Sequence, residues 1–235
     1  MPPTFPATLL PANDAGRLRT LHQFQIVNTT PELVFDNYSA WAAQLFNTPI
    51  ALISLVDADY VWFKAIVGAE VSHLIRHESM CAAAILANER VVVSDYQPNS
   101  CTLIKPDVAQ AIGLNFYAGA QLQARDGARL GMLAIIDKVA RAFSDAEADV
   151  LARLADLVSG TIELRHQYLA ASQPAAWGEA QQELTQALDD NAALTRYLAA
   201  RSPRLDLTEP ATSQLVGRRL ANVAQVLARR LGAVA

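Results

Sequence analysis

Apolar residues recur at three- and four-residue intervals in two segments near the start of the chain, a spacing that predicts amphipathic helices. The first segment runs from Asp14 to Val27 and the second from about Pro31 to Phe46. A hydroxyl of Thr29 or Thr30 could accept a free backbone N–H, and Pro31 suits a first helical turn. We therefore expect the second helix to begin there. The apolar positions are Leu18, Leu21 and Phe24 in the first segment and Val34, Tyr38, Trp41 and Leu45 in the second.

After Pro49 the pattern changes to runs of β-branched and aromatic residues, which predict strands. Ile50 to Asp57 and Tyr60 to Gly68 flank a short break and should form a hairpin. Asn115 to Gln123 and Arg129 to Asp137 flank a glycine-containing connection and should form another, with Val91 to Ser94 as a further strand. Strict alternation would place Val61, Phe63, Ala65 and Val67 on the core side and Trp62, Lys64 and Ile66 on the other. These patterns predict a mainly antiparallel sheet of five to six strands.

Helical patterns return at four places along the chain. Ser79 to Asn88 is alanine-rich, as helices often are. Ser144 and Glu147 have the spacing of a capping box, and apolar residues continue at helical intervals from there to Tyr168. Beyond Pro174, the ranges Gly178 to Ala200 and Thr208 to Leu231 also have helical patterns, with a break around Ser202 and Pro203. The chain should therefore end in a helical hairpin.

These elements indicate an α+β protein with one main domain. We expect an extended segment at residues 1–13, a domain at 14–169 that includes the long helix, and a helical extension at 170–235. The 235 residues are 52% hydrophobic and 18% charged, as suits a packed globular protein. The start of the chain lacks the features of a signal peptide, and the apolar runs are too short to cross a bilayer, so we expect a cytoplasmic protein without membrane contacts.

Charge and motifs narrow the function classes. The formal net charge of -4 gives no general attraction to nucleic acid. The arginines of the last predicted helix are interpreted as a solvated outer face rather than a nucleic-acid site: Arg218, Arg219, Arg229 and Arg230. The glycine-rich phosphate loops, the HExxH motif and the GxSxG motif are all absent from the sequence. Cys81 and Cys101 are the two cysteines, and we expect free thiols, no metal and no cofactor.

Six ordered segments of the chain resemble bacterial GAF domains. The family's ILDTPPE with FD, SLVD, WFK, SFCAHAI, FYAGAPL and LGTLCVID segments are similar, in order, to Ile26–Glu32 with Phe35-Asp36, Ile53–Asp57, Trp62–Lys64, Ser79–Ile85, Phe116–Ala120, and Leu130-Gly131 with Ile136-Asp137. The resemblance implies a GAF-like, PAS-related fold: a central sheet with helices packed on one face. It also implies a ligand pocket on the other face, roofed by the middle helix and a loop. GAF domains bind cyclic nucleotides, tetrapyrroles or small metabolites, or have no known ligand.

Three positions depart from the family pattern. Ala83 replaces a histidine, Ala134 a cysteine and Gln121 a proline. Neither cysteine is followed by the histidine found in many chromophore-attaching members, so covalent tetrapyrrole attachment is not expected. His73 or His77 could serve as a haem ligand, and we interpret both instead as solvated loop residues. A partial match to the cyclic-nucleotide motif, Asp137-Lys138 with Phe143 and Glu147, is interpreted as a structural Lys138–Glu147 ion pair.

The candidate pocket residues are the aromatic and polar groups of the expected roof and the adjacent strands: His77, Cys81, Asp95, Tyr96, Phe116 and Tyr117. The leading hypothesis is a non-enzymatic sensory or regulatory module that binds an unidentified small ligand. It would signal through a homodimer or a protein effector, because the helical extension has apolar faces that need partners. One alternative is a thiol enzyme like the free methionine sulfoxide reductases, with Cys81 and Cys101 as its cysteines. The other is a purely structural interaction module.

Overall fold

The core of the structure is a six-stranded antiparallel sheet. The computed structural model describes residues 10–95, 114–199 and 205–234. The strands are ordered β3-β2-β1-β6-β5-β4, and every neighbouring pair is antiparallel. Their bounds are β1 Ile50–Val56, β2 Tyr60–Val67, β3 His73–Ile75, β4 Val91–Asp95, β5 Phe116–Gln123 and β6 Arg129–Asp137. Both predicted hairpins are confirmed, and β3 is an addition that the sequence pattern did not reveal.

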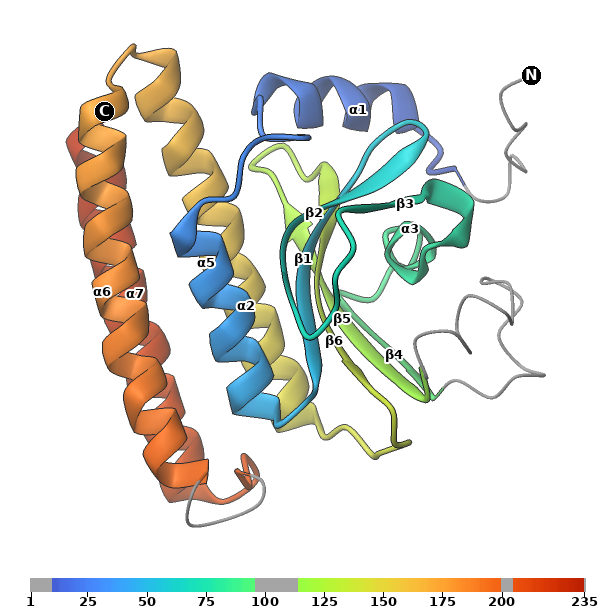
Figure 1. The fold of residues 1–235 in the computed structure, drawn as a ribbon, viewed down its shortest axis with the longest axis vertical. Coiled ribbons are helices and arrows are strands. Elements are labelled where there is room, and N and C mark those ends of the chain that lie inside the picture. The colour runs from blue at the N-terminus through green and yellow to red at the C-terminus, as the bar shows by residue number, and fades with distance from the viewer. Residues whose placement is uncertain (1–9, 96–113, 200–204, 235) are drawn as a thin grey trace.

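Helices form two layers on one side of this sheet (Figure 1). The inner layer consists of α2 (Leu33–Phe46) and α5 (Asp145–Ala170), which pack on the strands. The outer layer consists of α6 (Pro174–Ala199) against α2 and α7 (Pro210–Val234) against α5. On the opposite side lie the short helices η2 (Arg76–Glu78) and α3 (Met80–Ala84), while α1 (Asp14–Gln23) crosses one end of the sheet. This arrangement confirms the α+β fold, with helices packed on one face and a helical C-terminal extension.

The sheet separates two hydrophobic clusters. On β5, Phe116 and Ala118 belong to the large cluster beneath α2 and α5, whereas Tyr117 belongs to the smaller cluster beneath α3. Successive side chains of a strand point to opposite faces, so one strand contributes to both clusters. The cluster beneath α3 and the cluster beneath α2 and α5 are therefore separated by the thickness of the sheet.

The face assignment predicted for β2 was wrong because of a β-bulge. Ile53 pairs with Ala65 and Ser54 pairs with Phe63, so Lys64 is an extra residue without a partner on β1. Lys64 and Ala65 are both buried on the helix side, whereas Phe63 packs with the small cluster on the other side. Alternation resumes after the bulge in the opposite phase, which puts Ile66 on the same face as Phe63.

The start of α2 also differs from the prediction. The helix begins at Leu33, and Glu32 occupies the N-cap position without a side-chain capping bond. The Thr29 hydroxyl instead donates to the carbonyl of Ile26, at 2.8 Å, within the preceding turn. Thr29 is thus used to shape the connection from α1, and the Glu32 carboxylate is left for contacts described below.

The C-terminal helices form the predicted hairpin, and they pack on their own domain. A stripe of α6 and a stripe of α7 are buried against α2 and α5: Trp177, Ala180, Leu184 and Leu188 from the first, and Val216, Leu220, Val223 and Leu227 from the second. Glu183 of α6 pairs with Arg229 and Arg230 of α7, with 2.6 Å to Arg230 Nε. Three helices depart from their predicted bounds by several residues: α1 ends at Gln23 rather than Val27, α6 starts at Pro174 rather than Gly178, and α3 has five residues instead of extending to Asn88. Among the residues that the structure describes, no helix is both long and apolar enough to cross a membrane.

The capping box of α5 is confirmed and gives a first prediction. Ser144 Oγ accepts from the Glu147 N–H at 3.3 Å, and the Ser144 N–H donates to the Glu147 carboxylate at 2.8 Å. Ser144→Ala removes one of these bonds and should lower the free energy of unfolding by about 1 kcal/mol, as measured by urea denaturation. Ser213→Ala, at an exposed position on α7, is the control and should change stability little. Equal stability of Ser144→Ala and the wild type would contradict the prediction.

Candidate functional site

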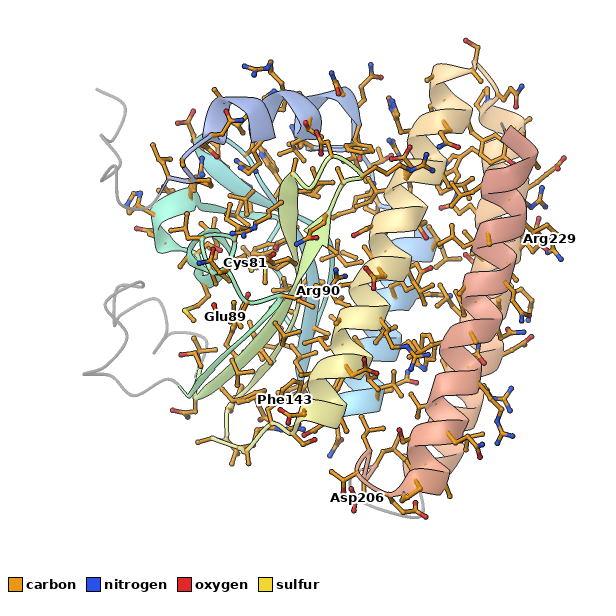
Figure 2. All side chains as sticks on the ribbon, turned by 180° about the vertical axis from the view of Figure 1, so that it is seen from behind. Cys81, Glu89, Arg90, Phe143, Asp206 and Arg229 are labelled. Atoms are coloured by element: carbon orange, nitrogen blue, oxygen red, sulfur yellow. The ribbon has the colours of Figure 1, made fainter. Side chains whose placement is uncertain are left out.

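A cavity of about 140 Å³ lies between the sheet and α3. Strands β1, β2, β5 and β6 form its floor, and α3 with the loop before β3 forms its roof. Figure 2 shows Cys81 on this side of the sheet, opposite the side on which Arg229 marks α7. The described residues that line the cavity are Ile50, Leu52, Phe63, Ile66, Ala69, Val71, Leu74, Glu78, Ser79, Met80, Cys81, Leu114, Tyr117 and Ile136. Apolar side chains therefore make up most of its wall.

Tyr117 and Cys81 form the polar centre of the cavity wall. The Tyr117 hydroxyl donates to Cys81 Sγ at 3.7 Å, and the Cys81 N–H donates to Ser79 Oγ at 3.2 Å. Gly119, two residues along β5, makes room for the phenol, because a Cβ there would lie 2.4 Å from the Tyr117 hydroxyl oxygen. The conformation of Tyr117 thus depends on a glycine at that position.

Burial keeps both of these groups neutral. Loss of solvent raises the pKa of the Cys81 thiol, although hydrogen bonds from neighbouring groups, Ser54 first among them, act in the opposite direction. Burial, and then the neighbouring Cys81, raise the pKa of the Tyr117 phenol well above its ordinary value. A reactive cysteine needs a lowered pKa and access to solvent, and Cys81 is only 3% exposed. This environment is typical of a structural thiol.

The structure brings together two of the six candidate residues. Cys81 and Tyr117 line the cavity. Phe116 lies on the opposite face of β5, where its ring packs 5.7 Å from the ring of Phe143, because adjacent strand residues cannot share a face. His77, on η2, lies outside the lining and approaches Glu78 at 3.9 Å.

The remaining candidates are placed only in part. Asp95 ends β4, where its backbone pairs with Phe116, and its side chain is outside the described residues, as are Tyr96 and Cys101. The prediction missed apolar lining residues such as Leu52, Ile66 and Met80. The alternation of Ile50, Leu52 and Ser54 along β1 was the available signal for this face.

The described residues hold no group that suits a metal or a tetrapyrrole. No cluster of three or more His, Cys, Asp or Glu side chains occurs among residues 10–95, 114–199 and 205–234. The His73 ring packs 4.8 Å from that of Trp62, outside the cavity lining. A cavity of about 140 Å³ is also far smaller than a porphyrin, so the residues present do not fit haem.

On the helix side of the sheet, one carboxylate holds three elements together. Glu32 accepts from Lys64 Nζ at 2.6 Å, from Arg165 Nε at 2.8 Å and from the indole N–H of Trp177 at 2.8 Å. Lys64 also donates to Thr29 Oγ1 and to the carbonyl of Thr30, while Arg165 donates to the carbonyls of Phe24 and Gln25. We call Glu32, Lys64, Arg165 and Trp177 the Glu32 network. It connects the bulge of β2 to α5 and to α6.

The comparison of sequences decides the family. The GAF domain model matches residues 30–162, which include the sheet, the cavity and the Glu32 network except Arg165 and Trp177. The chain belongs to the GAF domain family.

A curated protein is similar to this chain in sequence, and several solved structures are similar to it in fold. A cyclic di-GMP phosphodiesterase of Pseudomonas aeruginosa is 32% identical over 153 residues, which are 65% of this chain and 26% of that protein. The GAF domain of an Acinetobacter phosphoenolpyruvate-protein phosphotransferase is 19% identical, with a TM-score of 0.49 over 67% of this chain and 98% of the other. A type II free methionine-R-sulfoxide reductase from Thermoplasma acidophilum is 16% identical, with a TM-score of 0.46 over 54% and 88%. The chain thus spans about a quarter of the length of the curated relative.

The departures from the GAF sequence pattern all lie on the cavity side of the sheet. Ala83 is buried on α3, and Ala134 is fully buried in the small cluster, so neither position supplies a polar group. Gln121 donates from Nε2 to the carbonyls of Ala87, at 2.9 Å, and Glu89, at 3.1 Å. It therefore fastens the connection after α3 to β5. This role needs an amide N–H that the family's proline does not have.

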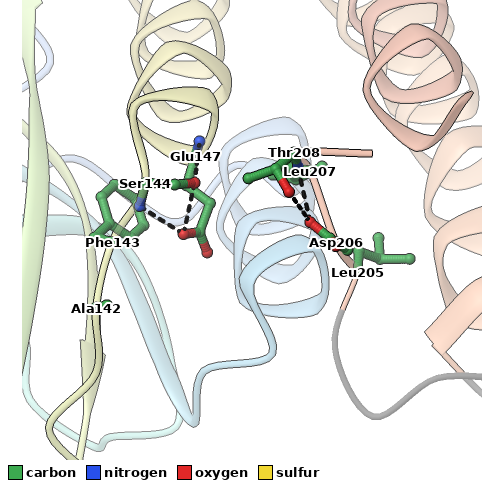
Figure 3. Close-up of a pocket in the computed structure, with 8 residues that line it drawn as sticks. All are labelled: Ala142, Phe143, Ser144, Glu147, Leu205, Asp206, Leu207 and Thr208. Carbon is green, nitrogen blue, oxygen red and sulfur yellow. Dashed lines mark hydrogen bonds between the residues drawn. The ribbon is translucent and has the colours of Figure 1, made fainter. Parts of the chain in front are cut away.

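A second hollow, of about 380 Å³, lies where the C-terminal helices meet this GAF domain (Figure 3). Its wall combines the start of α5 with the segment before α7: Ala142, Phe143, Ser144, Glu147, Leu205, Asp206, Leu207 and Thr208. Glu147 completes the capping box and pairs with Arg141, which takes the place predicted for Lys138. The Thr208 N–H and hydroxyl donate to Asp206 at 2.9 and 2.6 Å. These polar groups are engaged in the capping box of α5 and in the turn before α7, so we treat the hollow as a structural junction.

The environment of Cys81 predicts slow chemistry at its thiol. Because burial raises its pKa and limits access, alkylation of Cys81 by iodoacetamide at neutral pH should be much slower than alkylation of free cysteine. Unfolding in urea should bring the rate to that of a free thiol. Peptide-level mass spectrometry separates Cys81 from Cys101. A native rate at Cys81 equal to that of glutathione would contradict the structural assignment.

The Glu32 network predicts how stability depends on pH. Burial alone would raise the pKa of Glu32, but the hydrogen bond from Lys64, the charges of Lys64 and Arg165 and the indole of Trp177 together lower it. Its contribution to stability is therefore complete above the ordinary glutamate pKa of about 4.3 and is lost as the pH falls through the lower pKa of the folded state. At pH 7, Glu32→Gln leaves two buried cations without their carboxylate and should cost roughly 3 kcal/mol.

Urea denaturation of wild type and Glu32→Gln at a series of pH values checks this prediction. The difference between the two proteins should narrow as the pH falls from the ordinary glutamate pKa through the lower pKa of folded Glu32, because the Glu32 carboxylate then becomes protonated and is uncharged like glutamine. Glu179→Gln, at an exposed position on α6, is the matched control and should show no such trend. A difference that stays constant down to pH 2 would argue against a charge-based role for Glu32.

Proposed function

We propose that this GAF domain is a non-enzymatic sensory or regulatory module, in which occupancy of the cavity affects the docking of the C-terminal helices. The observation that carries the proposal is the path through β2. Phe63 and Ile66 line the cavity, and Lys64 between them reaches through the bulge to Glu32 on the opposite face. Glu32 in turn holds Trp177 of α6.

The chemistry of the site supports binding over catalysis. A hydrolase or thiol enzyme needs an activated nucleophile or a positioned acid and base. The described cavity wall contains a buried thiol that is held neutral, and its phenol donates to that thiol. The phosphodiesterase activity in the name of the Pseudomonas relative is not assigned to this chain, because the similar region makes up 26% of that protein.

Displacement of the C-terminal helices would be the output of the module. The apolar stripes that led us to predict a homodimer are buried within one chain. A homodimer, or a complex with a protein effector, would therefore form through surfaces that become available when α6 and α7 leave α2 and α5. A ligand that binds both arrangements equally well could not produce this shift, so the cavity must differ between them.

A double-mutant cycle tests the coupling. Val71→Phe fills the cavity from the loop before β3, and Trp177→Phe removes the indole N–H that donates to Glu32 while keeping an aromatic ring. In the wild-type background, Val71→Phe should change the hydrogen-exchange rates of α6 amides near Trp177, measured by mass spectrometry. In the Trp177→Phe background the same substitution should have a smaller effect, because the link is already cut.

The control for this cycle is Val93→Phe, which introduces the same side chain away from the cavity. Val93 pairs with Ala118 and faces the helix side of β4, where it is 46% exposed. It should leave α6 exchange unchanged. If Val71→Phe also leaves α6 exchange unchanged, or if its effect is the same with and without the Trp177 indole, the proposed coupling is wrong.

A further inference from the structure

The size of the cavity limits what it can hold. Pockets for drug-sized ligands have volumes of about 300–1,000 Å³. The cavity beneath α3 has about 140 Å³, which is close to an engineered apolar cavity of about 150 Å³ that stays dry and binds benzene or xenon. A nucleotide base with its sugar and phosphate exceeds this space, whereas one aromatic ring fits it.

The wall chemistry points the same way. No lysine, arginine or histidine is among the described lining residues, so these residues offer a bound anion no counter-charge. Burying an ion without a partner is strongly unfavourable, and a neutral ligand avoids this cost.

The groups in the wall that can form hydrogen bonds are largely engaged with each other. The Tyr117 hydroxyl donates to Cys81, and Ser79 Oγ accepts from the Cys81 N–H. The remaining surface presents aromatic rings of Phe63 and Tyr117 and the thioether of Met80. Aromatic rings and thioethers pack favourably against another aromatic ring.

We propose that this cavity binds a small, uncharged, apolar molecule of about the size of a single benzene ring. The proposal rests on the sensory role given to the cavity above and names the class of ligand that the role requires. It excludes cyclic nucleotides and other charged metabolites as ligands of this cavity. The bound ring would lie between Phe63 and Met80 and next to Tyr117.

Methionine methyl groups provide a direct probe of this binding. The chain has three methionines, of which Met80 lines the cavity and Met132 is buried in the same cluster. With methyl-13C methionine in the full chain, toluene should shift the Met80 resonance saturably, and Met80→Leu assigns that resonance. Benzoate, which has the same ring with a carboxylate, and cyclic di-GMP, which represents the nucleotides, are the controls. Neither should shift the Met80 resonance.

Two variants show whether the binding takes place in the cavity. Val71→Phe should weaken toluene binding by about tenfold or more, because the new ring occupies the space of the ligand. Val93→Phe, on the other face of the sheet, should bind toluene as the wild type does. The ligand class is wrong if toluene leaves Met80 unshifted, if benzoate or cyclic di-GMP shifts Met80 as strongly, or if Val71→Phe binds toluene normally.

This experiment can fail separately from the proposed sensory function. If toluene does not bind but Val71→Phe still changes α6 exchange through Trp177, the ligand class is overturned and the coupling stands. If toluene binds but the double-mutant cycle shows no coupling, the cavity is a binding site without an effect on the C-terminal helices, and the sensory role is overturned.

Discussion

The arrangement of this GAF domain depends on a single carboxylate held at the start of a helix. Glu32 is 13% exposed at its side chain and has two buried cations and an indole around it. Removing such groups from water is costly, and the cost is offset only when every partner is in place. The network is therefore sensitive to the position of β2, α5 and α6 together. It also explains why α2 begins without a side-chain cap, since its N-cap residue is used in these contacts.

The bulge in β2 makes this contact compatible with an apolar cavity. In a strictly alternating strand, Lys64 and Ile66 would share a face. Either a cation would then enter the cavity or an apolar side chain would leave it. The extra residue at Lys64 separates the two, so Phe63 and Ile66 face the cavity while Lys64 faces Glu32. Bulges commonly change the direction in which a side chain points. Here the bulge lets four consecutive residues of β2, Phe63 to Ile66, make contacts on both sides of the sheet.

Local sequence patterns predicted the elements of the fold, and non-local contacts explain what they missed. The Ser144 to Glu147 capping box and the two hairpins were predicted because their determinants lie within a few residues of each other. Lys64, at the bulge, pairs with Glu32, which lies thirty-two residues away, so no pattern within β2 reveals this contact. Phe116 and Tyr117 were assigned to one pocket because both are aromatic residues on a strand expected beside it. The alternation of side chains along β5 would have separated them. The engagement of Trp177 with Glu32 is likewise invisible without the fold.

Helix α5 is buried on two sides, against the sheet and against α7. Leu154 and Val158 are completely buried, and Gly160 lies so close to α7 that a Cβ would be 2.7 Å from Leu227 Cδ2. Packed interfaces of this kind respond to small displacements by changing partners rather than by stretching. If cavity occupancy and docking of the C-terminal helices are coupled, the coupling must be reciprocal: whatever holds α6 and α7 in place alters affinity in the cavity by the same factor. A partner protein that captured these helices would then act as an effector of the cavity, and a single free energy would describe both directions of control.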